Sequence, residues 1–232
     1  MGLFNKQHKP YLIVSDTHAP YQHKDTLKFL KEVHKKYGCN EIIIHIGDLV
    51  DFNGISHYSK ELDAPTAKDE YAEALRFTKE FTKVFPKGVL ILGNHDCRVK
   101  SQLKEIGLPI EMIKDYNQLL GLPKGWKVEP LCHIIKEFDV LCEHGNNSIG
   151  MTGAITTAIY KRTSYVQGHA HSAGGVLYSA NHKSLIFGLN VGCLVDNTSI
   201  GMAYGEYLRK KGTLGCGVIF SGCNAIFVPM EK

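Results

Sequence analysis

Apolar runs and helical periodicity alternate through the first 92 residues of the chain. Residues 25–37 and 66–85 place apolar side chains three and four positions apart, which predicts two helices. Gly38 is expected to end the first helix, and Thr66, with Asp69 three positions on, to begin the second. Three apolar runs predict buried strands, at residues 10–15, 41–46 and 89–92. This β-α-β-α-β order predicts a parallel sheet with right-handed crossovers.

The pattern changes in the second half of the chain. Residues 97–122 predict one or two short helices broken near Gly107, followed by a loop over 121–126. A helix is expected at about 150–162, followed by an apolar run at 165–166. Three hairpins are predicted from paired short segments: 131–136 with 139–143, 175–180 with 184–190, and 215–220 with 224–228. We therefore expect an α/β protein with a second, antiparallel or mixed sheet, in which residues 1–232 form one domain of two packed sheets with helices outside.

Polar clusters rich in Asp, His and Asn follow five of the apolar runs. The clusters are Asp16-Thr17-His18, Gly47-Asp48 with Asp51, Gly93-Asn94-His95-Asp96, His144-Gly145 and Gly168-His169-Ala170-His171. A buried strand that ends in a polar residue delivers that residue to the rim of its sheet. Carboxylate oxygen and imidazole nitrogen are ligands of hard and borderline divalent metals. Five polar clusters at strand ends predict one shared metal site. His45 lies inside a predicted strand and is expected to be a core residue.

The spacing within the clusters suggests roles for single residues. Two neighbouring cations need an anionic bridge, and Asp48 on a tight glycine turn is the candidate. Asp16 and His18 lie two apart at a predicted strand end, so their side chains should point the same way and chelate one ion. His169 and His171 repeat that spacing.

Two further candidates, Asn94 and His144, complete a set of seven mixed oxygen and nitrogen ligands. Only Cys97 and Cys142 lie near these positions, which argues against a soft thiolate site and favours Mn, Fe, Zn, Ni or Co. His95, beside Asn94, is placed to protonate a leaving oxygen, with Asp51 as its orienting carboxylate.

The ordered set of clusters, from Asp16 to His171, resembles the calcineurin-like metallophosphoesterase family. Flanking segments, such as Gly107-Leu108-Pro109 and Val191–Asp196, look like its small phage and prophage members. The resemblance implies a four-layer α-β-β-α sandwich with a dimetal site, Mn first among the metals, at the carboxyl ends of the strands. It also implies attack of metal-bound hydroxide on phosphorus.

The resemblance also assigns the seven candidate ligands to two metal ions. It implies one metal held by Asp16, His18, Asp48 and His171, and a second held by Asp48, Asn94, His144 and His169. His95 would donate the proton, Asp51 would hold it, and Asp96 would organise the turn. The protein serine/threonine phosphatase branch has Asp-Arg-Gly where Asp51-Phe52-Asn53 stands here, so the phosphate-clamping Arg is missing. This departure argues against a phosphoprotein substrate, and Arg98 or His57 is the candidate replacement.

Several functional alternatives stay open. The phage-like context favours a nucleotide or nucleic-acid phosphodiester as substrate, with a phosphomonoester of a small metabolite as the alternative. A non-catalytic metal-binding scaffold is the rival class, against which the intact histidines argue. The basic run Arg209-Lys210-Lys211, near Tyr204 and Tyr207, predicts either a nucleic-acid contact or a solvated loop.

Composition limits the setting without choosing a substrate. The net charge of +4 permits a nucleic-acid partner without demanding one. Seven cysteines without a paired spacing indicate a reducing compartment, and neither a signal peptide nor a run of about 20 apolar residues is visible. We therefore expect a cytoplasmic protein without a membrane partner, in the host cytoplasm if the chain is phage-encoded.

Overall fold

The computed structural model describes residues 8–57, 64–112, 115–145, 149–196 and 211–231. Its first sheet has six strands in the order β11-β10-β1-β2-β3-β4, of which β1 to β4 are parallel. These strands are β1 (Tyr11–Val14), β2 (Ile42–His45), β3 (Lys87–Ile91), β4 (Trp126–Glu129), β10 (Gly215–Ser221) and β11 (Asn224–Pro229). The parallel sheet predicted from the first 92 residues is confirmed.

The second sheet has five strands in the order β5-β6-β7-β9-β8. Its central strands β6, β7 and β9 are parallel, and hairpin partners β5 and β8 run antiparallel at its edges. These strands are β5 (Cys132–Ile135), β6 (Val140–Glu143), β7 (Ser164–Gln167), β8 (Gly174–Ala180) and β9 (Leu185–Val191). The second sheet is therefore mixed, which is one of the two arrangements, antiparallel or mixed, that the sequence predicted.

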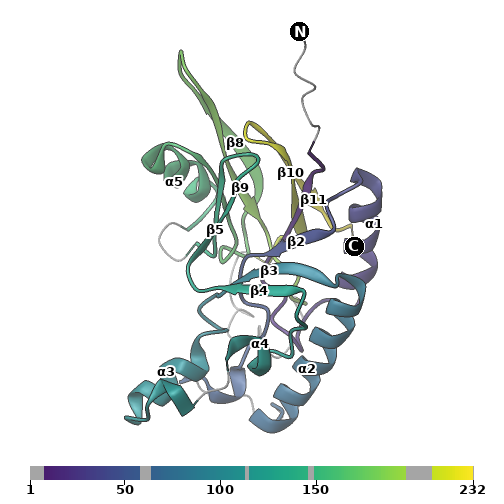
Figure 1. Ribbon diagram of the computed structural model, residues 1–232, viewed down its shortest axis with the longest axis vertical. Coiled ribbons are helices and arrows are strands. Elements are labelled where there is room, and N and C mark those ends of the chain that lie inside the picture. Colours follow the sequence, from purple (N-terminus) through teal and green to yellow (C-terminus); the bar gives the residue numbers. More distant parts are fainter. Residues whose placement is uncertain (1–7, 58–63, 113–114, 146–148, 197–210, 232) are drawn as a thin grey trace.

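Helices cover the outer faces of both sheets, which gives the four layers seen in Figure 1. Helices α1 (Thr26–Tyr37) and α2 (Ala67–Val84) pack on the first sheet through a core that includes Leu30 and Phe81. Helix α5 (Gly153–Lys161) covers the second sheet. The shorter elements are η1 (Asn53–Ile55), α3 (Arg98–Glu105), η2 (Ile110–Met112) and α4 (Tyr116–Leu119). The predicted α-β-β-α sandwich is confirmed.

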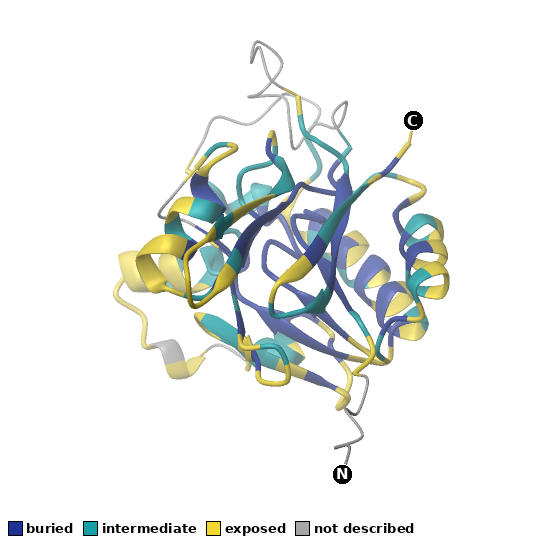
Figure 2. Cartoon of the chain, turned by 90° about the horizontal axis from the view of Figure 1, so that it is seen from above, coloured by how far each residue is buried: buried dark blue, intermediate teal, exposed yellow. Residues whose placement is uncertain are grey.

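Strand β1 shows how the sequence produces two cores. Leu12 faces the helices, whereas Ile13 packs between the two sheets with Val166 and Leu189. Both faces of the strand are therefore apolar, which is why it reads as a continuous apolar run. Figure 2 shows the buried strands between helices that expose one side to solvent.

Helix ends follow the predicted signals. The Thr66 side chain accepts a hydrogen bond from the Asp69 backbone N–H at 3.2 Å, and α2 begins at the next residue. Gly38 adopts the left-handed conformation (φ 59°) that ends α1. The apolar face of α2 buries Phe77 and Phe81 against the first sheet, and Phe85, directly after the helix, is buried in the same core.

Two expectations about the strands are corrected. Trp126 to Glu129 form β4 at the edge of the first sheet, where the sequence analysis placed a loop up to Trp126 and no strand before residue 131. The alternation of apolar and polar residues in this segment is too short to predict a strand. Trp126 holds the segment in place: its ring packs on Phe81, and its indole N–H donates to Phe85 O at 2.9 Å. The last hairpin, β10 with β11, pairs with β1 in the first sheet and does not extend the second.

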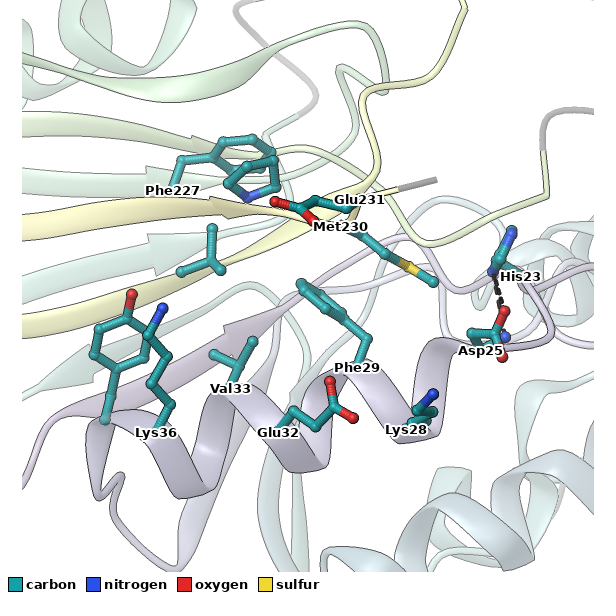
Figure 3. Close-up of a pocket in the computed structure, with 13 residues that line it drawn as sticks. His23, Asp25, Lys28, Phe29, Glu32, Val33, Lys36, Phe227, Met230 and Glu231 are labelled. Atoms are coloured by element: carbon teal, nitrogen blue, oxygen red, sulfur yellow. Dashed lines mark hydrogen bonds and ion pairs between the residues drawn. The ribbon is translucent and has the colours of Figure 1, made fainter.

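One surface groove lies away from the polar clusters. A hollow of about 630 Å³ runs between α1 and the end of β11, lined by Phe29, Val33 and Met230 and bordered by charged side chains such as Lys36 (Figure 3). No predicted site residue lines it. Among the described residues no helix is long and apolar enough to cross a membrane.

Candidate metal centre

The polar clusters meet at the carboxyl ends of parallel strands from both sheets. The turn after β1 pairs with the turn after β2: the backbone N–H groups of Asp16 and His18 donate to Gly47 O and Asp48 O, both at 3.0 Å. Between the sheets, the His169 N–H donates to the Asp16 carboxylate at 2.9 Å. Backbone hydrogen bonds thus hold the segments together independently of any ion.

Asp16, His18 and His171 form the first group, with ligand atoms all within 4.8 Å of one another. The Nε2 atom of His171 lies 3.0 Å from Asp16 Oδ1 and 3.0 Å from His18 Nε2. The other oxygen of Asp16 accepts from the Ser15 hydroxyl and from the His169 N–H. Asp16 and His18 are buried, whereas His171 is partly exposed. The first group therefore opens toward solvent on its His171 side.

The reason given for pairing Asp16 with His18 is wrong, although the two side chains do converge. Strand β1 ends at Val14, and Asp16 and His18 have φ values of 52° and 48°, in the left-handed region. Their side chains meet because the backbone turns, and strand alternation plays no part. His169 (φ 60°) repeats this conformation after β7. Left-handed backbone is uncommon for residues other than Gly and often marks functional turns.

Asp48, His144 and His169 form the second group. The Nε2 atom of His144 lies 3.2 Å from Asp48 Oδ2, 3.0 Å from Asn94 Oδ1 and 3.3 Å from His169 Nδ1. Asp48 Oδ2 also lies 3.7 Å from His18 Nε2 of the first group. One carboxylate oxygen therefore stands between the two groups.

The imidazole tautomers make this donor set fit cations. His144 Nδ1 donates to Ile46 O at 2.9 Å, and His18 Nδ1 lies 2.6 Å from Asp51 Oδ1. Both partners only accept hydrogen bonds, so in the neutral rings each Nε2 carries a lone pair. In the neutral rings these lone pairs face carboxylate and amide oxygens, so a positive charge, either a proton on Nε2 or a bound cation, is needed between them.

The buried charges polarise each other strongly. Burial alone would raise the pKa of Asp48, but the His144 and His95 rings lower it. Burial opposes charge on His144, yet the Asp48 carboxylate raises its pKa to about 9. His18 is similar: against burial, the hydrogen bonds with Asp16 and Asp51 raise its pKa well above the usual value. The site thus favours carboxylates balanced by positive charge.

His18, Asp51 and His95 form a third group, in which Asp51 serves two rings. Its Oδ1 atom lies 2.6 Å from His18 Nδ1 and 2.8 Å from His95 Nδ1. The sequence analysis expected Asp51 beside His95 and did not anticipate its contact with His18. Asp51 therefore orients a candidate ligand and the candidate proton donor with one oxygen.

Arg98, on the first turn of α3, reaches the same group. Its guanidinium donates to Asp51 O at 2.8 Å and lies 3.2 Å from His95 Nε2. Its side chain is 18% exposed, so Arg98 is mostly buried but keeps some access to solvent. Phe52, at the position of the missing Arg, is buried and stacks on Tyr71 with ring centroids 6.0 Å apart. Position 52 thus points into the helix-side core.

His57, the other substrate-binding candidate, makes its contacts with α3. Its Nε2 atom lies 2.8 Å from Gln102 Nε2 and 3.2 Å from Glu105 Oε2, and its side chain is 64% exposed. These contacts with described residues do not bring His57 to the three groups. Residues 58–63, 146–148 and 197–210, which include Tyr204, Tyr207, Arg209 and Lys210, lie outside the described residues.

Asp96 organises the turns rather than the site. Its carboxylate is fully buried and accepts from the backbone N–H groups of Asp48 (2.8 Å), Gly93 (2.9 Å) and Val50 (3.1 Å). Burial and the neighbouring Asp48 charge raise its pKa to about 7, while the backbone donors hold it down. The side chain therefore ties the turn after β3 to the turn after β2.

Close backbone packing explains the glycines at this junction. A Cβ atom at Gly93 would collide with the Asp48 carboxylate, and one at Gly47, where φ is 106°, would lie 2.9 Å from Gly93 Cα. Sequence reasoning gave Gly47 a role but missed that of Gly93. It also missed Ser15, whose only signal is its place directly before Asp16.

Comparison with known families agrees with this geometry. The model of a family described as calcineurin-like phosphoesterase matches residues 9–190, a span that contains all three groups. The chain belongs to the calcineurin-like phosphoesterase family. The family is one of hydrolases that act on phosphoester bonds and bind divalent metals, and the clusters of this calcineurin-like chain offer sites for them.

The remaining comparisons add little about substrate. No curated protein matches this calcineurin-like chain. Among solved structures, it is similar to a protein of unknown function, AQ665, from Aquifex aeolicus, with 16% identity, coverage of 75% of this chain and 82% of the other, and a TM-score of 0.36. A similarity at that level carries no argument about activity.

Proposed function

We propose that this protein is a dimetal-dependent phosphoesterase whose substrate is a nucleotide or nucleic-acid phosphodiester. The observation that carries the proposal is the convergence of imidazole nitrogens and buried carboxylates in two adjacent groups, with Asp48 Oδ2 between them. Asp16, His18, Asp48 and His171 would hold one divalent ion, and Asp48, Asn94, His144 and His169 the other. Mn is our first choice among Mn, Fe, Zn, Ni and Co, all of which accept carboxylate oxygen and imidazole nitrogen as ligands.

The chain's own residues supply the rest of the chemistry. Bound divalent cations contribute Lewis acidity, which lowers the pKa of water and offsets charge on the phosphoryl group. In the contact with Arg98, His95 Nε2 accepts, so that nitrogen would first take up a proton from solvent when Arg98 leaves it. His95 would then donate this proton from Nε2 to the leaving oxygen, because Asp51 occupies its Nδ1. Asp51 holds the ring through Nδ1, and Asp48 Oδ2 lies 4.0 Å from His95 Nε2.

Arg98 is our candidate for the phosphate contact. Its guanidinium is anchored on Asp51 O by one nitrogen, and the other nitrogen lies beside His95 Nε2, where the leaving group would stand. On substrate binding we expect that second nitrogen to exchange His95 for a phosphoryl oxygen. His57, exposed on the adjacent face, stays a prediction of the sequence alone.

A reducing setting, the cytoplasm, is part of the proposal. All seven cysteines are free thiols, and four of them, Cys39, Cys142, Cys193 and Cys216, are buried. Burial raises the pKa of the Cys39 thiol to about 11, so it stays protonated and behaves as a small apolar side chain.

The test compares wild type with Asp48→Asn. Metal-free protein is titrated with Mn²⁺, and turnover is measured on bis-nitrophenyl phosphate, nitrophenyl phosphate, cyclic nucleotides and single-stranded DNA, with and without chelator. We expect two bound ions, chelator-sensitive turnover with diesters preferred, and a loss on the order of 10³-fold in Asp48→Asn, since a Lewis-acid ion is worth several kcal/mol.

Asp139→Asn is the matched control, because Asp139 shares the left-handed backbone of Asp48 (φ 53° against 54°) but is exposed on a hairpin. It should behave as wild type. Preference for the monoester would overturn the diester assignment, and two bound ions without turnover on any phosphoester would favour the scaffold.

A further inference from the structure

His45 is a fully buried polar residue that the proposed chemistry does not use. It is the last residue of β2, with its ring edge-on to Phe81, on the helix side of the first sheet. Its Nε2 atom lies 3.2 Å from the Thr17 hydroxyl oxygen. Its Nδ1 atom has no hydrogen-bond partner among the described residues. A buried histidine with one partner and one bare nitrogen needs an explanation.

Thr17 fixes the direction of that hydrogen bond. Its hydroxyl donates to Leu49 O at 3.0 Å, so its oxygen is free to accept from His45. His45 therefore carries its proton on Nε2 and a lone pair on Nδ1. Burial lowers the pKa of His45 to about 3, which agrees with a neutral ring.

The hydrogen-bonded chain ends between two candidate ligands. Thr17 separates Asp16 from His18, and both neighbours hold left-handed backbone that L residues rarely adopt. Leu49 O, the acceptor of the Thr17 hydroxyl, also accepts the Ala19 N–H at 2.9 Å. The chain from His45 through Thr17 to Leu49 therefore joins the Asp16–His18 turn to the turn that follows Asp48.

We propose that His45 is a positioning residue, which holds the Asp16-Thr17-His18 turn in its metal-binding conformation by donating from Nε2 to Thr17. This inference rests on the metal centre proposed above and extends it to a residue that touches no ligand. Phe81 packs on the ring and leaves Nδ1 bare, so the single hydrogen bond to Thr17 carries the effect.

The experiment titrates metal-free protein with Mn²⁺ by calorimetry. His45→Phe keeps an aromatic ring without a donor, and Thr17→Val keeps the branched shape without the hydroxyl. Each should weaken the more affected Mn²⁺ site about tenfold, as loss of an outer partner of a ligand does. The double variant should be no weaker than either single variant, since both remove the same hydrogen bond.

His45→Gln tests rescue, because the Gln side-chain nitrogen stands as many bonds from Cβ as His Nε2. It should bind Mn²⁺ within about threefold of wild type, whereas His45→Asn, whose nitrogen corresponds to Nδ1, should behave like His45→Phe. Thr78→Val is the matched control: Thr78 is buried, but its hydroxyl donates to Ala74 O within α2. It should shift Tm and leave Mn²⁺ affinity unchanged.

The outcomes separate the two proposals. A wild type that binds no Mn²⁺ overturns the proposed function. A wild type that binds, with His45→Phe unchanged or with additive losses in the double variant, overturns only the role of His45. If His45→Phe does not fold, ¹⁵N chemical shifts of the wild-type ring decide, because a proton on Nδ1 contradicts the inference.

Discussion

The two sheets contribute different kinds of residue to one site. The first sheet supplies every carboxylate of the three groups, the imidazole of His18, the amide of Asn94, the candidate proton donor His95 and Arg98, whereas the second supplies only imidazoles, those of His144, His169 and His171. The imidazoles are also held differently. The Asp51 side chain holds the first-sheet rings His18 and His95, whereas His144 from the second sheet is held by a backbone carbonyl of the first sheet, Ile46 O, directly after β2. We infer that proton transfer and substrate contact belong to the first sheet and ligation is shared.

Removing His95 should have the largest effect, and an effect on kcat that differs in kind from that of removing a ligand of the second sheet. His95→Ala should slow hydrolysis of esters with poor leaving groups by about 10²-fold or more, and that of nitrophenyl esters far less, because only the former need a general acid. His169→Ala, from the second sheet, should slow both classes equally. The measurement is kcat on a series of leaving groups; equal losses in His95→Ala would contradict its role.

Asp51→Asn should have an intermediate effect, on both metal binding and proton donation, because Asp51 holds His18 as well as His95. We expect about a 10- to 100-fold weaker Mn²⁺ affinity at one site, as for loss of an orienting partner, together with the leaving-group dependence of His95→Ala. The second site, whose His144 is held by Ile46 O, should keep its affinity. Calorimetry resolves the two steps, and equal weakening of both would remove the distinction between the sheets.

Arg98→Ala should have the smallest effect, confined to substrate. A hydrogen bond to a charged group contributes about 1.5–3 kcal/mol, so KM should rise about tenfold or more. Mn²⁺ affinity should stay as in wild type. Exposed Arg162→Ala, on the loop after α5, is the control. A fall in Mn²⁺ affinity in Arg98→Ala would place Arg98 among the groups that hold the metal centre.

Sequence patterns predicted most helices and hairpins of this fold, because helix caps and tight turns depend on residues close together in the chain. Both helix signals, at Thr66 and Gly38, correspond to observed caps, and all three hairpins form. The pattern failed where tertiary context decides. Strand β4 depends on Trp126 packing against Phe81, and the placement of β10 beside β1 depends on long-range pairing that no periodicity encodes.

The residues of the candidate site were predictable as a set, whereas their geometry was not. Ordered Asp, His and Asn clusters after apolar runs identified every member of the three groups. The left-handed backbone of Asp16 and the shared use of Asp51 follow from how the turns pack, which sequence spacing does not encode. His45 reads as a core residue and is one, yet its partner Thr17 lies 28 positions away.

The close contact between Gly93 and Asp48 has a consequence for anyone who varies this scaffold. Since neither Gly47 nor Gly93 leaves room for even one methyl group, a library that changes these two positions would consist mostly of variants that lose the junction. His57, by contrast, is 64% exposed and lies against α3, so its position should tolerate new side chains. A library aimed at new substrates should therefore vary exposed positions of this kind and keep both glycines.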